Sequence, residues 1–333
     1  MRIAFASCMC SQVFKDQPVW DQIAEQQPDY LVMLGDSIYL DINVPSYPDN
    51  PGMPIGPQNM NDETFMRHLF ERYTAQLNQP QFAKLVKQMP NNRVFSIWDD
   101  HDFLWNDACG AEFTKGMAQQ SKIVISTSFQ EAFRRALAQS LAQGSFPNSY
   151  TDSAFMCSNQ PPMSAPSINL NNQAWLHLSD GRTYRTRTWL ISDKNCTLLG
   201  SEQRGKFGEA IRADLNAIHL FASGSTISGW KHYPNDLNWI KKLAAKSRTL
   251  VLSGDIHRNE VDIFPDTGGF PLHEATSSGA AVRTGVVVGG KQENFGLLDI
   301  GEKIASVRLF HRGSEQNKLA RSYDIQTWQD TSS

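Results

Sequence analysis

The stretch Phe95-Ser96-Ile97-Trp98-Asp99-Asp100-His101-Asp102 decides how the rest of the sequence is interpreted. The apolar run from Val94 to Trp98 predicts a buried strand, and two carboxylates and an imidazole follow it directly. Ionisable groups at a strand end are costly to desolvate unless they are paired or bound to metal. A solvated turn, with an Asp capping a short helix, explains this stretch equally well when it is taken alone. Its meaning therefore depends on the other strand ends.

Three other expected strands end in the same way. The strand from Ile3 runs into Ser7-Cys8-Met9-Cys10, the strand from Tyr30 into Gly35-Asp36-Ser37-Ile38-Tyr39, and the strand from Arg248 into Ser253-Gly254-Asp255-Ile256-His257. Ligands of open α/β sheets bind at the carboxyl ends of the strands. Thiolate, carboxylate and imidazole groups from four strands therefore predict a metal site. The glycine before two of the Asp residues permits a tight turn close to a ligand.

The remaining sequence alternates between expected helices and strands before it ends in strands. The patterns predict helices at 18–27, 64–89 with a break near Pro80, 118–141, 201–216 and 237–246, two strands within 175–192 joined by the turn Ser179-Asp180-Gly181-Arg182, and late strands at 270–275, 284–289, 294–300 and 303–311. This order predicts an α/β (α+β) protein with two sheets and helices outside them.

Composition limits the class of protein. The 333 residues have a net charge of -3 and are 40% hydrophobic, which is typical of a globular protein and gives no overall charge for binding nucleic acid. We expect one domain over residues 1–312, with irregular insertions near 43–62 and 144–173, and a polar C-terminal tail over 313–333. The five cysteines do not form the pattern of a disulfide framework.

We expect neither a signal peptide nor a membrane span in this sequence. A strand is expected from the first residues, and no run approaches the roughly 18 apolar residues that a transmembrane helix needs. We therefore expect a soluble protein, which is cytoplasmic as given or the mature form of an exported protein.

The strand-end motifs resemble those of the calcineurin-like metallophosphoesterases, and specifically the alkaline-phosphatase-D-like (PhoD-like) branch. The matching pieces are Phe5-Ala6-Ser7-Cys8, Gly35-Asp36-Ser37-Ile38-Tyr39, Trp98-Asp99-Asp100-His101-Asp102 with Trp105-Asn106-Asp107, and Leu252-Ser253-Gly254-Asp255-Ile256-His257. Weaker matches are Leu199-Gly200-Ser201-Glu202-Gln203, Ser228-Gly229-Trp230 and Glu274-Ala275-Thr276-Ser277-Ser278. The resemblance implies a four-layer αββα sandwich with a multinuclear metal centre.

The resemblance also implies the metal ligands. Cys8, Asp36, Tyr39 and His257 would hold one ion, Fe(III) by the resemblance, because thiolate and phenolate suit a strongly Lewis-acidic metal. Asp36 would bridge to a second site shared with Asp100 and Asp255, whose oxygen donors suit Ca, Mg or Mn. Each single residue has a simpler explanation: Cys8 as a small buried side chain, Tyr39 packed beside the Pro-rich segment, His257 as a core histidine.

Further residues are candidates for roles around the metals. His101 matches the position that donates a hydrogen bond or proton near the leaving oxygen, and Asp102 is the carboxylate expected to orient its ring. Asp99 and Asn106 are candidates for metal or second-shell positions. Arg258, Lys231 and His232 are candidates for binding substrate phosphate.

The branch also has an Asp-x-Arg segment, followed by basic residues, before the Leu-Gly-x-x-Gln motif. The segment that we align there, from Leu190 to Cys196, lacks the arginine. This departure concerns the substrate contacts and leaves the metal ligands untouched.

The predicted activity is that of a metal-dependent phosphoric ester hydrolase. Two cations neutralise the ester and lower the pKa of a bound water, and a small-molecule or lipid phosphate ester is the expected partner. Two other classes stay open: a catalytically silent metal-binding module that binds a partner through its two insertions, and a thiol redox protein using Cys8 and Cys10.

Overall fold

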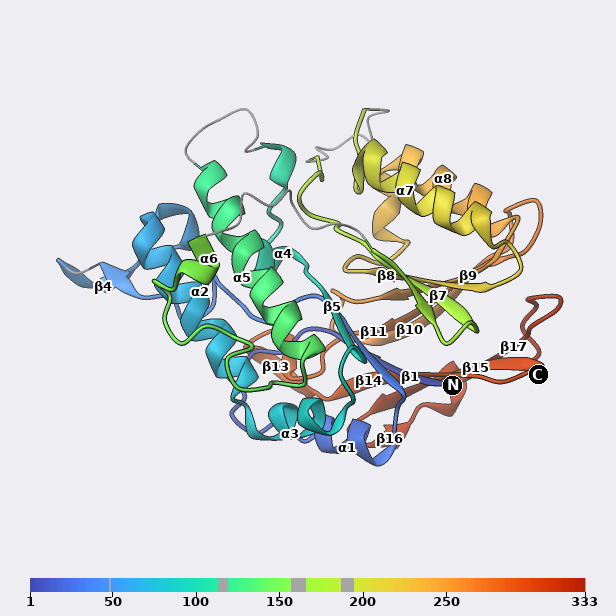
Figure 1. Cartoon of the computed structure of the whole chain (residues 1–333), viewed down its shortest axis with the longest axis horizontal. Helices are drawn as coiled ribbons and strands as arrows, with labels where there is room; N and C mark the ends of the chain where they lie inside the picture. The colour runs from blue at the N-terminus through green and yellow to red at the C-terminus, as the bar shows by residue number, and fades with distance from the viewer. Residues whose placement is uncertain (48, 113–118, 157–165, 187–194, 333) are drawn as a thin grey trace.

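Two β-sheets packed face to face form the centre of the molecule, and helices cover both outer faces (Figure 1). The computed structural model describes residues 1–47, 49–112, 119–156, 166–186 and 195–332. Parts of several expected segments lie outside these ranges, including a portion of the 144–173 insertion and most of the second strand within 175–192.

The first sheet has the strand order β16-β15-β14-β1-β2-β5, with β17 also paired to β15. Its strands are β1 (Arg2–Ala6), β2 (Tyr30–Leu34), β5 (Val94–Ile97), β14 (Asn294–Ile300), β15 (Ile304–His311), β16 (Ser314–Glu315) and β17 (Arg321–Asp324). β1, β2 and β5 are parallel, so their carboxyl ends lie at one edge of the sheet.

The second sheet has the strand order β10-β11-β9-β8-β7-β6. Its strands are β6 (Ser167–Leu170), β7 (Ala174–Leu178), β8 (Ile218–Ser223), β9 (Arg248–Ser253), β10 (Asn259–Phe264) and β11 (Leu272–Ser277). β7, β8 and β9 are parallel. β8 and β10 were not expected from the sequence, because His219 interrupts the apolar pattern of β8 and β10 is mostly polar.

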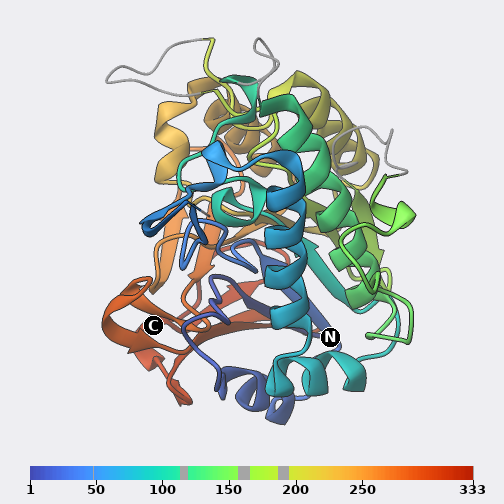
Figure 2. The same ribbon diagram turned by 90° about the vertical axis from the view of Figure 1, so that its left-hand side faces the viewer.

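Helices form the two outer layers. α1 (Val19–Glu25), α2 (Asp62–Leu77), α3 (Pro80–Gln88) and α5 (Gln120–Ala138) cover the first sheet, and α7 (Gly200–Ala213) and α8 (Pro234–Ala244) cover the second (Figure 1). α2 and α5 lie side by side in front of the first sheet in Figure 2. The predicted break near Pro80 is confirmed. Pro80 begins α3, and the side chain of Gln79 accepts a hydrogen bond from the backbone N–H of Phe82.

The inner faces of the two sheets share one hydrophobic core. Phe5 and Val32 of the first sheet belong to the same buried cluster as Leu176, Leu220 and Leu252 of the second. Burying apolar surface contributes about 25 cal/mol per Å². This shared core is therefore the main stabilising contact between the two sheets. We therefore propose that the chain folds as a single domain.

The Pro-rich segment 43–62 forms a small exposed hairpin and a short 3-10 turn. The hairpin consists of β3 (Ser46–Tyr47) and β4 (Asn50–Pro54). A second hairpin, β12 (Val282–Gly285) and β13 (Val288–Gln292), occupies the place where a single strand over 284–289 was expected. In the insertion 144–173, the described residues include α6 (Ser153–Met156) and the edge strand β6.

The expectation of a polar tail from Gly313 onward is wrong. β17 pairs with β15 over four residue pairs, and Tyr323 and Trp328 are buried. Trp328 donates its indole N–H to the carbonyl of Thr249 at 3.2 Å and packs against His273. The polar residues of this segment alternate with its few large apolar ones, so its average composition hides the positions that enter the core.

We expect Trp328→Ala to lower the free energy of unfolding by about 3–5 kcal/mol, because it deletes a fully buried indole and leaves a cavity. Urea denaturation followed by circular dichroism measures this change. Glu302→Ala, at an exposed turn, is the matched control and should stay within about 0.5 kcal/mol of wild type. A loss below about 1 kcal/mol for Trp328→Ala would show that the C-terminal segment is not part of the core.

Among the described residues, no helix has the length and apolar character needed to cross a membrane.

Candidate metal centre

The carboxyl ends of parallel strands from both sheets meet at one place. Gly35 has φ +94°, and a Cβ there would lie 2.7 Å from the Cβ of Asp99. A Cβ on Gly254 would lie 2.6 Å from Ser7 Oγ. Only glycine fits these two positions, because any side chain would separate the strand ends. The four strand ends identified from the sequence are therefore brought together.

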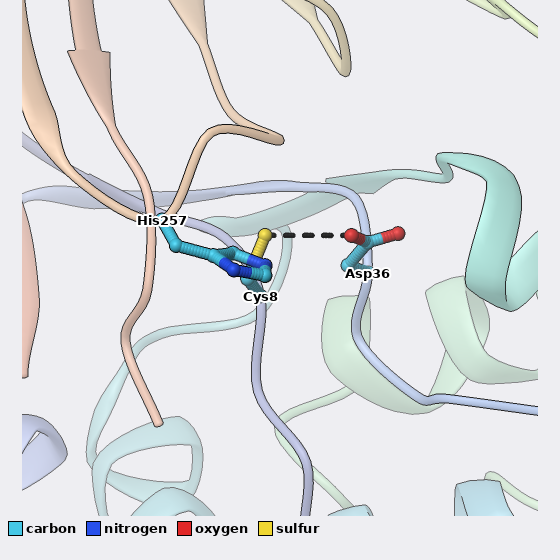
Figure 3. A group of neighbouring side chains, drawn as sticks. All are labelled: Cys8, Asp36 and His257. Carbon is cyan, nitrogen blue, oxygen red and sulfur yellow. Dashed lines mark hydrogen bonds between the residues drawn. The ribbon is translucent and has the colours of Figure 1, made fainter. Parts of the chain in front are cut away.

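The first cluster consists of Cys8, Asp36, Tyr39 and His257. The Cys8 thiol donates to Asp36 Oδ2 at 3.4 Å, and the Tyr39 hydroxyl lies 3.3 Å from both Asp36 Oδ2 and His257 Nε2. Figure 3 shows Cys8, Asp36 and His257 converging from three separate loops. Ligand atoms of these three residues lie within 4.8 Å of one another, which is close enough for one ion to contact all of them.

The backbone at this cluster is in an unusual conformation. Cys8, Asp36 and His257 have φ values of +61°, +52° and +52°, and Asp255 has φ +75°. Non-glycine residues with positive φ are uncommon and cluster at functional sites, where surrounding structure holds them in place. Strain at four candidate ligands favours a functional explanation over ordinary packing.

Two hydrogen bonds fix the orientation of His257. Its Nδ1 donates to the carbonyl of Thr284 at 2.9 Å, and its backbone N–H donates to Ser278 Oγ at 2.9 Å. With Nδ1 protonated, Nε2 presents its lone pair to Tyr39 and the cluster. This is the usual arrangement of a metal-binding histidine, whose second nitrogen donates to a carbonyl or carboxylate.

Without a bound cation, this cluster disfavours the ionised forms of its own side chains. Burial, followed by the charge of Asp36, raises the pKa of the Cys8 thiol well above its usual range. Burial also raises the pKa of Tyr39, and the neighbouring Cys8 adds to it. The pKa of Asp36 is raised mainly by burial. A bound cation reverses each of these effects, because it stabilises thiolate, phenolate and carboxylate together.

The second cluster shares Asp36 with the first. Ligand atoms of Asp36, Asp100 and His101 lie within 4.8 Å of one another. Asp100 Oδ2 also accepts the backbone N–H of Asp107 at 2.6 Å. Asp255 belongs to neither group of ligand atoms among the described residues, but its charge interacts with those of Asp99 and Asp100.

Arg182 holds two of the strand-end carboxylates. It is buried, forms an ion pair with Asp99, and reaches Asp100 Oδ1 at 3.4 Å. Burial raises the pKa of Asp100, but the charges of Arg182 and His101 outweigh it and hold that pKa below its usual value. Because Asp99 is paired with Arg182, we interpret it as a residue that supports the site and not as a metal ligand.

Arg182 belongs to an Asp-x-Arg sequence, Asp180-Gly181-Arg182, which also precedes the Leu-Gly-x-x-Gln motif and which the sequence pattern predicts as a strand-joining turn. Asp180 accepts from the backbone N–H of Arg182 at 3.0 Å and from the Trp98 indole at 2.8 Å. Arg185, three residues on, bonds Tyr233 and Ser225 and acts electrostatically on Asp99 and Asp100. Most of the segment aligned earlier, Leu190 to Cys196, lies outside the described residues.

The expected role of Asp102 is also wrong. Asp102 accepts the backbone N–H groups of Ser37 and Asp99, and so it caps α4 (Asp100–Phe103). The carboxylate that contacts the His101 ring is Asp41, whose Oδ1 lies 2.6 Å from His101 Nδ1. A carboxylate three residues into a helix is well placed to cap it, which explains why Asp102 turns away from the imidazole.

Four predicted candidates lie apart from the clusters. The Asn106 side chain donates to Asp107, and Arg258 is exposed and paired with Glu260. Lys231 and His232 are exposed on the 3-10 turn Gly229–His232. Within the described residues, no recorded contact joins these four side chains to Cys8, Asp36, Asp100 or His257.

The donor set fits a metal. Buried oxygens Asp36 Oδ1 and Asp100 Oδ1 have no hydrogen-bond partner among the described residues, although such atoms are normally satisfied. Thiol, phenol, imidazole and carboxylate groups converge on the first cluster, and carboxylates dominate the second. Soft and hard donors in adjacent positions suit two ions of different character.

Comparison with known proteins finds a family resemblance in the N-terminal part of the chain. Residues 3–139 match the family model described as PhoD-like phosphatase. This part of the chain is PhoD-like. A solved structure described as "Structure of PhoD" shares the fold with a TM-score of 0.66, covering 100% of this chain and 72% of that chain at 16% identity. The PhoD-like resemblance and the αββα fold class are both confirmed.

A curated protein of different name also matches in part. Phosphoserine aminotransferase of Paraburkholderia phymatum is 31% identical over 119 residues, which cover 34% of this chain and 32% of that protein. The chain thus spans about a third of the length of the curated relative it matches. A match of this extent transfers no activity, whereas the PhoD-like match includes Cys8, Asp36, Tyr39 and the Asp100-His101 pair.

Proposed function

We propose that this chain is a metal-dependent phosphoric ester hydrolase. The observation that carries the proposal is the pair of clusters joined through Asp36, with unpartnered carboxylate oxygens beside them. Phosphate esters are anionic and therefore resist attack by hydroxide. Two bound cations would neutralise the ester's charge and lower the pKa of a bound water. The PhoD-like match of residues 3–139 supports the same class of reaction.

The ligands divide between two ions. Cys8, Asp36, Tyr39 and His257 would hold Fe(III), because thiolate and phenolate favour a strong Lewis acid. Asp36, Asp100 and Asp255 would hold Ca, Mg or Mn through oxygen atoms alone. When bound, these ions supply charge neutralisation and water activation.

The chain's own residues supply orientation and proton transfer. His101 lies beside both Asp36 and Asp100, where its ring can donate a proton to the leaving oxygen. Burial lowers the pKa of His101, but Asp36 and the hydrogen bond to Asp41 outweigh it and raise the pKa to about 10. Arg185, whose charge acts on Asp99 and Asp100, is a further candidate for binding the substrate phosphate that was not expected from the sequence.

The substrate class is a small-molecule or lipid phosphate ester. A silent metal-binding module would need the ligands but not an imidazole held beside them. A thiol redox protein would need both thiols to be available. Here Cys8 bonds Asp36 and Ser278, and Cys10 bonds Gln12.

The test is hydrolysis of nitrophenyl phosphate and bis(nitrophenyl) phosphate side by side, before and after chelation. We expect turnover of at least one ester, loss of that turnover on chelation, and recovery when metal is added back. The ratio of the two rates assigns monoester or diester preference. Turnover that survives complete removal of metal, or no turnover with any metal, would contradict the proposal.

A further inference from the structure

A cavity of about 260 Å³ lies between α2, α3, α5 and the loop 141–148. Its apolar lining includes Phe70 and Leu77 of α2 together with Leu141 and Phe146 of the loop. The rings of Phe70 and Phe146 stack with their centroids 6.0 Å apart. Small-molecule sites are concave, mostly apolar and carry a few placed polar groups, and this volume is near the lower end of their range.

Hydrogen bonds to α5 hold the loop wall of the cavity in place. The backbone N–H of Leu141 donates to the carbonyl of Ala136 at 2.9 Å, and Arg135 Nε donates to the carbonyl of Ser145 at 3.4 Å. Ala136 and Arg135 both belong to α5. The cavity is therefore formed before a ligand arrives, which lowers the cost of ordering the chain on binding.

One polar side chain of the lining lacks a partner. Thr74 of α2 lines the cavity, and its hydroxyl oxygen Oγ1 is buried with no hydrogen-bond partner among the described residues. A helical threonine can donate to the carbonyl four residues earlier, as Thr127 does to Ile123 at 2.8 Å. Because buried hydroxyls are normally satisfied, the unpaired Thr74 hydroxyl favours a ligand that places an oxygen atom beside it.

A lysine lies at the mouth of the cavity. Lys87, in the last turn of α3, belongs to the lining and is exposed. Within the described residues no ion pair is recorded for Lys87, whereas Lys84 of the same helix pairs with Asp21 at 2.8 Å. None of the described residues that line the cavity is acidic. The charge of Lys87 is therefore available to an anionic group of a ligand.

The cavity and the candidate metal centre lie against opposite sides of α2. Phe70 and Thr74 line the cavity. Since a helix has about 3.6 residues per turn, His68 and Arg72 lie on the other side of it. There they bond backbone carbonyls of the segment 40–43, which follows the metal-ligand candidates of the second strand end. The cavity is therefore a second site, separate from the metal ligands.

We propose that this cavity is a binding site for a small amphipathic anion, a carboxylate on a short alkyl chain. The alkyl chain packs against Phe70, Leu77 and Leu141. An oxygen of the carboxylate accepts the hydroxyl of Thr74, and the negative charge lies beside Lys87. The site goes beyond the proposed hydrolase function and does not depend on it.

The test is isothermal titration calorimetry of the metal-loaded full chain with octanoate, and with octanol as a neutral ligand of similar size. We expect one octanoate to bind per chain and octanol to bind more weakly. In Lys87→Gln the affinity for octanoate should fall about threefold, while the affinity for octanol stays unchanged. Lys84→Gln removes a lysine of the same helix that lies outside the cavity lining, and should bind octanoate like wild type.

Methyl NMR of the same protein locates the ligand. Ala136 lines the cavity from α5, so its methyl signal, assigned by its loss in Ala136→Ser, should move as octanoate is added. The dissociation constant from this shift should equal the calorimetric one. Asp36→Asn changes the metal centre and should leave the shift unaltered, because the two sites are separate.

A second variant tests the hydroxyl independently of the charge. Thr74→Val keeps the shape of the side chain and removes its hydroxyl, so octanoate should bind this variant more weakly than wild type. Octanoate that fails to bind in the millimolar range, or that binds both Lys87→Gln and Thr74→Val as tightly as wild type, would overturn the inference. Binding that disappears in Asp36→Asn, with the Ala136 signal unmoved in wild type, would place the carboxylate on the metal and would also overturn it.

Discussion

Asp36→Asn is expected to remove metal from both clusters and to abolish ester hydrolysis. Asp36 is the residue that the two clusters share, and its Oδ2 contacts both Cys8 and Tyr39. A neutral amide is a weaker ligand and cannot bridge two cations. Because even an outer-shell change costs about 10–100-fold in affinity, the loss of a shared ligand should exceed that range. Metal analysis of dialysed protein measures it, alongside turnover.

The two neighbouring thiols provide a matched comparison. Cys8→Ser should also abolish metal loading, whereas Cys10→Ser should be mild, since Cys10 is equally buried but bonds Gln12 instead of Asp36. Equal metal content in wild type and Asp36→Asn would disprove the shared-ligand model. Loss of function in Cys10→Ser that chelation does not reproduce would favour thiol redox chemistry.

His101→Ala is expected to keep its metal and lose turnover by about 10²–10⁴-fold on alkyl esters. The centroid of its ring lies 4.3 Å from that of Tyr39, with the two rings tilted, and its removal leaves Asp36, Asp100 and Cys8 in place. Single-turnover kinetics with metal analysis of the same sample measures both quantities.

His232→Ala is the control for this experiment. His232 is exposed and no recorded contact joins it to the clusters, so its replacement should leave kcat and KM near the wild-type values. Turnover retained in His101→Ala would remove His101 from the mechanism. Loss of metal in His101→Ala would show that His101 is a metal ligand.

The strand-end residues could be predicted because position along a strand fixes position in a parallel sheet. Asp36, Asp100, Asp255 and Cys8 each follow an apolar run, and parallel strands bring such ends to one edge. Gly35 and Gly254 added a second signal, since their close approaches tolerate no side chain.

The residues that support the site could not be predicted in the same way. Asp41 lies in a loop whose path depends on hydrogen bonds from His68 and Arg72 in α2, which are distant in sequence. Arg182 follows Asp180-Gly181, a pattern typical of a turn, and only tertiary packing aims it at Asp99. Asp102 has the right neighbour in sequence, but the capping of α4 takes its carboxylate.

Anomalous X-ray scattering from crystals of the metal-loaded protein shows whether metal binds at the carboxyl ends of the strands. We expect one peak in contact with Cys8 Sγ, Asp36 and Nε2 of His257, and a second beside Asp36 and Asp100. Crystals grown with iron and calcium that show neither peak, while the Cys8 thiol remains bonded to Asp36 and Ser278, would contradict it.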